Sequence, residues 1–161
     1  MGESLRLARP YFVLLAIFAV ARFLMGPMGV PYGRGHHVFS IVTLTLLSCV
    51  YYGVFARRWR GHRLMQAIAL AFLLGVVSQL VILLLTVLSY ALSLDTYFTS
   101  PVALNVRPLL ESDLVSQASL EQPVAFQDAL LNRVQGVIGN SIFSGIAGAI
   151  GWTIGGILPE R

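Results

Sequence analysis

The feature that most constrains this chain is an apolar run from about Leu64 to Leu92 that contains no charged residue. A helix needs about 20 apolar residues to cross the hydrocarbon core of a bilayer. This run is longer, so we expect its helix to tilt or to extend beyond the hydrocarbon. Charged residues make up only 11% of the whole sequence, against roughly 25% in a typical soluble domain. The sequence therefore predicts a membrane protein.

Further apolar segments extend this prediction to four membrane spans in one domain of 161 residues. The first segment is interrupted at Gly26 and Pro27, and the proline either kinks the helix or ends it. We predict an all-α integral membrane protein with four transmembrane helices, at about 11–29, 37–55, 64–92 and 134–158 of the domain 1–161.

The connection 93–133 is too long for a bare loop between bundle helices. Apolar residues recur on one face between Pro108 and Leu120, and a second apolar stripe follows Pro123, a residue that suits the first position of a helix. We expect one or two amphipathic helices there, capping the outer face of the protein. The second of them is expected to continue into the last span.

The arginines predict how the chain is oriented. Four of them lie between Ala56 and Arg63, where the second and third spans are joined. Cytoplasmic loops carry an excess of positive residues, so we expect this connection and both termini in the cytoplasm. This placement explains the net charge of +4 without a nucleic-acid partner. All eleven basic residues are arginine, which is typical of GC-rich coding and favours a bacterial inner (plasma) membrane.

An arginine and two adjacent histidines, Arg34, His36 and His37, lie in the glycine-rich loop between the first two predicted spans. Adjacent histidines diverge on a helix or a strand, so one metal ion could bind both only in an irregular loop. The remaining histidine, His62, is about 28 Å away along a helix, so it completes no metal or haem site. We predict a polar cap in which Arg34 pairs with an acidic residue of 93–133, Asp95 being the first choice.

Arg22 lies inside the first apolar run. A charged residue at membrane depth is costly and is by default a candidate for function. We expect Arg22 to reach the outer interface or to pair with an outer acid; the alternative is an anion anchor in a transport path. Arg22, Arg34, His36 and His37 are therefore the candidate residues for a ligand or a lipid headgroup.

The last predicted span is rich in small residues, which allow helix backbones to approach closely. They recur at four-residue spacing in several rows. One row is expected to face the protein's own helices, and another to face a partner or a second copy. The predicted packing residues are Ser141, Ser144, Gly145, Gly148, Gly151 and Gly155.

Catalytic chemistry has little basis in this sequence. It lacks a nucleotide-binding loop, a Ser/His/Asp set and a zinc-protease motif. Cys49 is the sole cysteine and falls in an apolar run, so we expect a small buried side chain. We predict no catalytic residues, cofactor or metal.

The preferred function is a non-catalytic structural, assembly or accessory subunit, with the lipid bilayer and other membrane subunits or a second copy as partners. One alternative is a small oligomeric transporter or channel whose path is lined by Arg22 and the region of Gln79. A further alternative is a redox or metal-binding membrane protein that uses His36 and His37.

Overall fold

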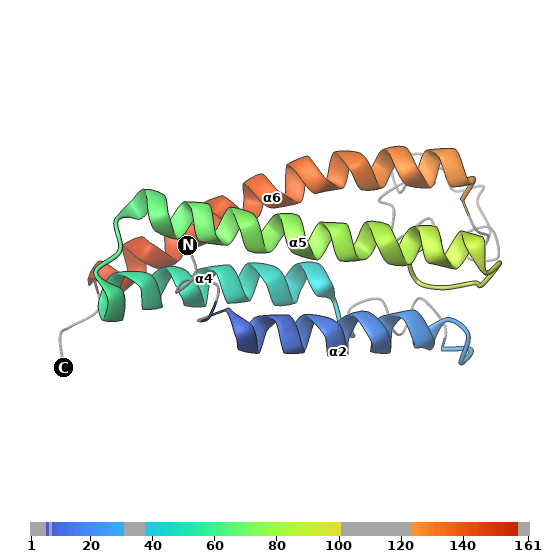
Figure 1. The fold of residues 1–161 in the computed structure, drawn as a ribbon, viewed down its shortest axis with the longest axis horizontal. Coiled ribbons are helices and arrows are strands. Elements are labelled where there is room, and N and C mark those ends of the chain that lie inside the picture. The colour runs from blue at the N-terminus through green and yellow to red at the C-terminus, as the bar shows by residue number, and fades with distance from the viewer. Residues whose placement is uncertain (1–5, 7, 31–37, 101–123, 158–161) are drawn as a thin grey trace, which may run out of the picture. The chain divides into compact units, whose positions relative to one another are not determined.

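The computed structural model describes residues 6, 8–30, 38–100 and 124–157. These residues form four α-helices and no strand (Figure 1). The all-helical prediction is therefore confirmed for the described part of the chain. The helices are α2 (Arg9–Met25), α4 (Ile41–Arg60), α5 (Leu64–Ala91) and α6 (Phe126–Ile157).

Two of the helices, α5 with 28 residues and α6 with 32 residues, are long and apolar enough to cross a membrane. Helix α2 has 17 residues, which is somewhat less than the roughly 20 that a perpendicular crossing needs. Helix α4 has 20 residues, but its last turn holds Arg57, Arg58 and Arg60.

The first helix ends earlier than the predicted span 11–29. Helix α2 stops at Met25, and Pro27 lies in the turn that follows it rather than at a kink. A residue before proline is disfavoured in the helical conformation, so the chain leaves the helix at Gly26. Gly29 then adopts a positive φ of 74°, a conformation that glycine reaches without steric cost.

The second helix is displaced from the predicted span 37–55. Helix α4 begins at Ile41 and continues to Arg60, so most of the arginine-rich stretch that we expected to be a loop is helical. Arginine is a good helix former, and positive side chains interact favourably with a helix C-terminus. Gly61, with a φ of 59°, ends the helix in the left-handed conformation that commonly follows a last turn.

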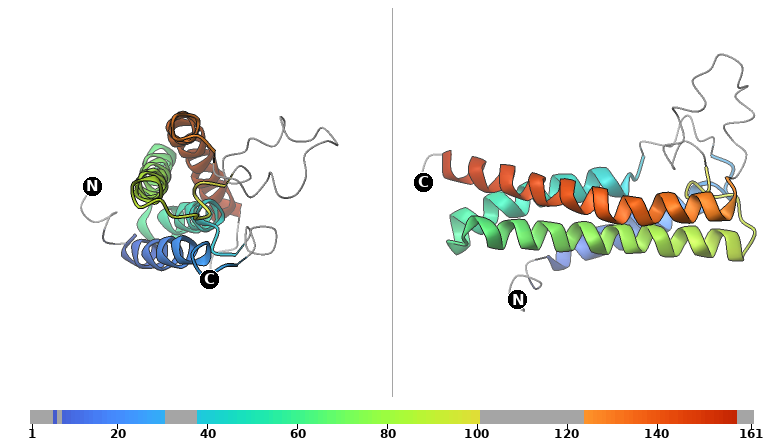
Figure 2. Two further views of the ribbon diagram at one scale, coloured as in Figure 1. Left: turned by 90° about the vertical axis from the view of Figure 1, so that its right-hand side faces the viewer. Right: turned by 90° about the horizontal axis from the view of Figure 1, so that it is seen from above.

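The chain divides into two compact units. Unit 1 comprises Met1–Ile17, Ile41–Leu80 and Gly136–Arg161, and unit 2 comprises Phe18–Ser40 and Val81–Gln135. In unit 1, α4 and the first part of α5 run antiparallel, joined by 61–63, and the later part of α6 lies against both (Figures 1 and 2). Fully buried side chains of this unit include Tyr11, Cys49 and Leu74.

Unit 2 is organised by the segment 92–100, which follows α5. Ser93 adopts a positive φ of 51°, and the chain then turns so that Thr96, Tyr97, Phe98, Thr99 and Ser100 are all buried. The hydroxyls of Ser89 and Thr96 are 2.7 Å apart and share a hydrogen bond. This buried turn is a feature that the sequence pattern did not predict.

The expected amphipathic helix from Pro108 to Leu120 lies outside the described residues, as does Pro123. Helix α6 begins at Phe126 and runs without interruption to Ile157. The polar residues before Val134 therefore belong to the same helix as the fourth predicted span, 134–158.

Candidate functional site

Helix α6 presents a seam of small residues to its neighbours in unit 1. Ser141, Ser144, Gly148, Gly151 and Gly155 are all buried, and their spacing alternates between three and four residues. This is the spacing of the inward positions in a heptad repeat, and it differs from the four-residue rows that the sequence predicted. The seam follows one line of contact along the helix, with Gly145 buried beside it.

The seam meets both neighbouring helices at backbone distance. A Cβ atom at Gly151 would overlap the carbonyl oxygen of Val50 on α4, and one at Gly155 would lie 3.0 Å from the carbonyl oxygen of Val54. On α5, a Cβ atom at Gly148 would overlap that of Ala71 and lie 3.2 Å from the carbonyl oxygen of Ala67. Glycine is therefore required here by close approach of the backbones.

Two glycines on the neighbouring helices complete this contact, and neither was predicted from the sequence. A Cβ atom at Gly53 would overlap the carbonyl oxygen of Gly148, and one at Gly75 would lie 2.7 Å from the side chain of Ser144. Glycine inside a helix costs about 1 kcal/mol relative to alanine. An isolated glycine in a helical pattern is thus itself a signal of close packing.

Several buried hydroxyls donate to carbonyl oxygens of their own helices, whereas that of Tyr11 lies 3.0 Å from the hydroxyl of Thr45 on α4 and 3.3 Å from the carbonyl oxygen of Leu74 on α5. Ser144 donates to the carbonyl oxygen of Asn140 at 2.8 Å, Thr86 to that of Ile82 at 2.8 Å, and Ser78 to that of Gly75 at 2.8 Å. Ser78 therefore bonds along α5. Gln79 is buried. Its Oε1 lies close to Gly136 on α6, at 3.5 Å from the position that a Cβ atom of Gly136 would take.

Arg22 lies in the last turn of α2 and is half-buried in unit 2. Its Nη1 donates to the carbonyl oxygen of Val38 at 3.1 Å, and its guanidinium lies 5.4 Å from the centre of the Tyr97 ring. Arginine over an aromatic face is attracted by the quadrupole of the ring. Arg22 thus contacts the buried turn and the residues that precede α4.

Arg133 of α6 holds the same turn and was not singled out from the sequence. Its Nε donates to the hydroxyl of Thr86 at 3.1 Å, and its Nη2 donates to the carbonyl oxygen of Phe98 at 2.9 Å. Hydrogen bonds from a charged donor are stronger than neutral ones. The sequence signal that could have identified this residue is its charge, which lies within a helix that is otherwise mostly apolar.

Tyr97 connects the buried turn to the segment that follows α2. Its hydroxyl donates to the carbonyl oxygen of Val30 at 2.9 Å. Burial raises the pKa of Tyr97 above its ordinary value, and the positive charge of Arg22 opposes this only in part. The phenol therefore keeps its proton at physiological pH and can act as a donor.

The other predicted ligand residues, Arg34, His36 and His37, lie outside the described residues. The expected pairing of Arg34 with Asp95 therefore stays a prediction. Among the residues that the structure describes, no group of three or more His, Cys, Asp or Glu side chains could hold a metal ion. Cys49 is buried, and its thiol donates to the carbonyl oxygen of Ala71 at 3.5 Å.

The arginine-rich end of α4 packs against the end of α6 in unit 1. The guanidinium of Arg57 lies 3.9 Å from the centre of the Trp152 ring and fills the space beside Gly156. The Trp152 Nε1 donates to the carbonyl oxygen of His62 at 2.8 Å. Arg57 and Trp152 therefore fix the short connection between α4 and α5.

Comparison of the chain with protein-family models, with curated proteins and with solved structures finds no match.

Proposed function

We propose that this chain is a non-catalytic, four-span protein of the bacterial inner membrane that serves as a structural, assembly or accessory subunit of a membrane complex. The observation that carries the proposal is the division of α6 into two faces. Opposite the buried seam, isoleucines recur every four residues and are exposed: Ile138, Ile142, Ile146, Ile150 and Ile154. An exposed apolar row of this length is costly in water and suits lipid or a membrane partner.

The two shorter helices support the four-span proposal through their exposed side chains. Val13, Ile17 and Val20 are exposed on α2, and Leu47 and Tyr51 on α4. A helix of 17 residues spans about 26 Å, so α2 crosses with flanking residues or a local thinning of the bilayer. Arginines at the end of α4 reach the headgroup region, because long positive side chains extend toward the interface.

A structural role is supported by polar side chains that form hydrogen bonds within the protein. Arg22, Arg133 and Tyr97 each donate a hydrogen bond to a backbone carbonyl oxygen of unit 2, and the hydroxyls of Ser89 and Thr96 bond to each other. The small residues of α6 contact α4 and α5. These interactions hold helices together and supply no nucleophile activated by a base.

Purification from native membranes in a mild detergent, followed by mass spectrometry, tests the proposed role. We expect other membrane subunits to copurify with the tagged chain in constant proportion. Substrate flux into liposomes that contain the purified chain alone would instead identify the transporter alternative. A stoichiometric metal ion or a haem absorption band, lost on His36→Ala or His37→Ala, would identify the redox alternative.

Labelling of single cysteines from outside the cell tests the topology. In a Cys49→Ser background, a cysteine placed at position 36 or 111 should react with an impermeant reagent, and one placed at position 60 should not. The reverse pattern would contradict the proposed orientation. The serine hydroxyl in this background retains a donor for the carbonyl oxygen that Cys49 contacts, so we expect the background variant to fold.

A further inference from the structure

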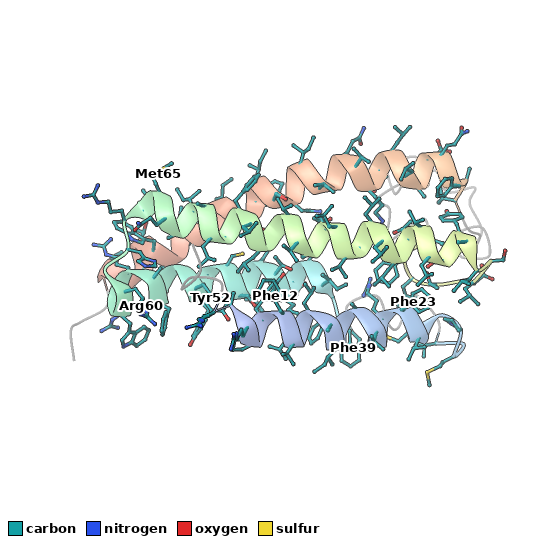
Figure 3. The ribbon with its side chains drawn as sticks, in the orientation of Figure 1. Phe12, Phe23, Phe39, Tyr52, Arg60 and Met65 are labelled. Atoms are coloured by element: carbon teal, nitrogen blue, oxygen red, sulfur yellow. The ribbon has the colours of Figure 1, made fainter. Side chains whose placement is uncertain are left out.

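The end of unit 1 at which α4 meets α5 combines positive charge with exposed apolar side chains. Arg60 and Arg63 are both exposed. On either side of them in the sequence, Trp59 is 63% exposed and Met65 is 71% exposed. Figure 3 shows Arg60 and Met65 at this end, with the Met65 side chain directed away from the helices.

The arginines at this end face no acidic residue in the described part of unit 1. The described residues of unit 1 contain no aspartate or glutamate, whereas Arg57, Arg58, Arg60 and Arg63 all lie in or beside the last turn of α4. Arg60 and Arg63 are exposed, so their charges can be reached by an external anion.

Arg57 has a separate role, which is to hold the connection between α4 and α5 in place. Its guanidinium lies over Trp152, and Trp152 in turn holds the carbonyl oxygen of His62. The backbone nitrogen of His62 donates to the carbonyl oxygen of Ala56 at 2.9 Å, and that of Arg63 donates to Oε1 of Gln66 at 2.9 Å. The connection that carries Arg60 and Arg63 is thus held in one conformation before any ligand binds, which lowers the entropic cost of binding.

The aromatic side chains of α4 form a ladder that leads to this end. The rings of Tyr51 and Phe55 are 6.3 Å apart, and those of Phe55 and Trp59 are 4.8 Å apart. Tyrosine and tryptophan are enriched where the hydrocarbon of a bilayer meets the headgroups. The ladder therefore passes from an apolar stretch of helix to a positively charged one at the place where phosphates would lie.

We infer that Arg60 and Arg63, together with Trp59 and Met65, form a docking surface for the headgroups of anionic phospholipids. The inference rests on the proposed membrane location. The arginines bind the phosphate and any further negative group of the lipid, while Trp59 and Met65 contact the upper part of its acyl chains. A free phosphate ion or a nucleic acid would use the arginines but would leave these exposed apolar side chains in water.

The test uses the full chain in nanodiscs of phosphatidylcholine with a minor share of phosphatidylglycerol. Native mass spectrometry of the released protein measures how much of each lipid stays bound. We expect the wild-type chain to retain phosphatidylglycerol in preference to phosphatidylcholine. Arg60→Gln combined with Arg63→Gln should reduce that preference roughly 10- to 30-fold, the order expected for two arginines at an anionic surface.

Two control variants separate the site from general charge. Arg6→Gln combined with Arg9→Gln removes equal charge from exposed positions of the same unit and should keep most of the preference. Arg60→Lys combined with Arg63→Lys keeps the charge and should also keep most of the preference for phosphatidylglycerol. An equal loss in the Arg6/Arg9 variant, or no preference in the wild-type chain, would overturn the inference.

The remaining outcomes separate this inference from the proposed function. A wild-type chain that is extracted from liposomes by alkaline carbonate would contradict the membrane location itself. A chain that stays inserted but binds both lipids equally would contradict only the docking surface. Inorganic phosphate that displaces phosphatidylglycerol at millimolar concentration would show that the arginines bind a free anion, which also overturns the proposed lipid contact.

Discussion

Units 1 and 2 hold their helices by different means. In unit 1, glycine and serine bring helix backbones into direct contact, as Gly151 does with Val50. In unit 2, the buried turn 92–100 is held by hydrogen bonds. Arg133 of α6 donates to Phe98 of the turn, and Tyr97 of the turn donates to Val30. The described residues of unit 2 include Asp95 and Asp128, whereas those of unit 1 include no acid.

The difference predicts two kinds of sensitivity. A contact between backbones has no side chain that can move aside, so unit 1 should tolerate added volume poorly and lost polarity well. A polar turn depends on donors that match its carbonyl oxygens, because an unsatisfied buried group costs about 1–3 kcal/mol. Unit 2 should therefore respond most to the loss of a donor.

The largest effect is expected for Gly151→Leu in unit 1. Its side chain would overlap the backbone of Val50, which cannot rotate away, so we expect a loss of about 3 kcal/mol or more in the free energy of unfolding. Gly148→Leu, which would overlap Ala71, should lose a similar amount. The measurement is unfolding by SDS in maltoside micelles.

Gly139→Leu is the matched control on the same helix. Nothing lies within 4 Å of the Cβ position of Gly139, so this variant should change the free energy of unfolding by at most about 0.5 kcal/mol, or stabilise the helix slightly. Unchanged stability and unchanged partner recovery in the Gly148 and Gly151 variants would contradict close packing along the seam.

The next effect is expected in unit 2, for Arg133→Gln. The shorter side chain cannot reach both Thr86 and the carbonyl oxygen of Phe98, so we expect a loss of about 2 kcal/mol. Hydrogen exchange should accelerate at residues 96–99 and remain unchanged around Gly148. Arg133→Lys keeps the charge without the fork of donors and should recover less than half of the loss. Exchange that accelerates equally in both units would remove the distinction between them.

A smaller effect is expected for Gly75→Ala in unit 1. The added methyl group would lie 2.7 Å from the side chain of Ser144, but alanine is the better helix former by about 1 kcal/mol. We expect a net loss of about 1 kcal/mol. Ser144→Gly in the same chain should restore part of it, measured as a positive coupling in a double-mutant cycle. Additive effects of the two substitutions would argue against their contact.

The smallest effect is expected for Tyr97→Phe, which removes the hydrogen bond to Val30 and should cost about 1 kcal/mol near neutral pH. The raised pKa of Tyr97 adds a pH dependence. The unfolded chain loses this proton near pH 10, before the folded chain does, so the contribution of the phenol is complete below that pH and declines as the pH rises further. The advantage of the wild-type chain over the variant should narrow in alkali; a constant difference would contradict the raised pKa.

The properties that follow from composition and local pattern could be predicted from the sequence. The uncharged run from Leu64 and the apolar residues of the other segments predicted helices, because a segment in lipid has to satisfy its backbone hydrogen bonds internally. The concentration of glycine and serine after residue 140 marked the helix that packs most closely. Arg22 was recognised because a charge within an apolar run is costly wherever its partner lies.

Only the tertiary structure decided which atoms meet. The heptad line through Ser144, Gly148 and Gly151, and the matching Gly53 and Gly75, depend on how each helix is rotated and displaced along its neighbour. Tyr97 reaches Val30, and Arg133 reaches Phe98, only because the chain turns after the end of α5 within unit 2. The sequence pattern of one helix shows which of its faces is apolar and which is polar. A contact depends on the faces of two helices and on the register between them, and the periodicity of a single helix does not contain that register.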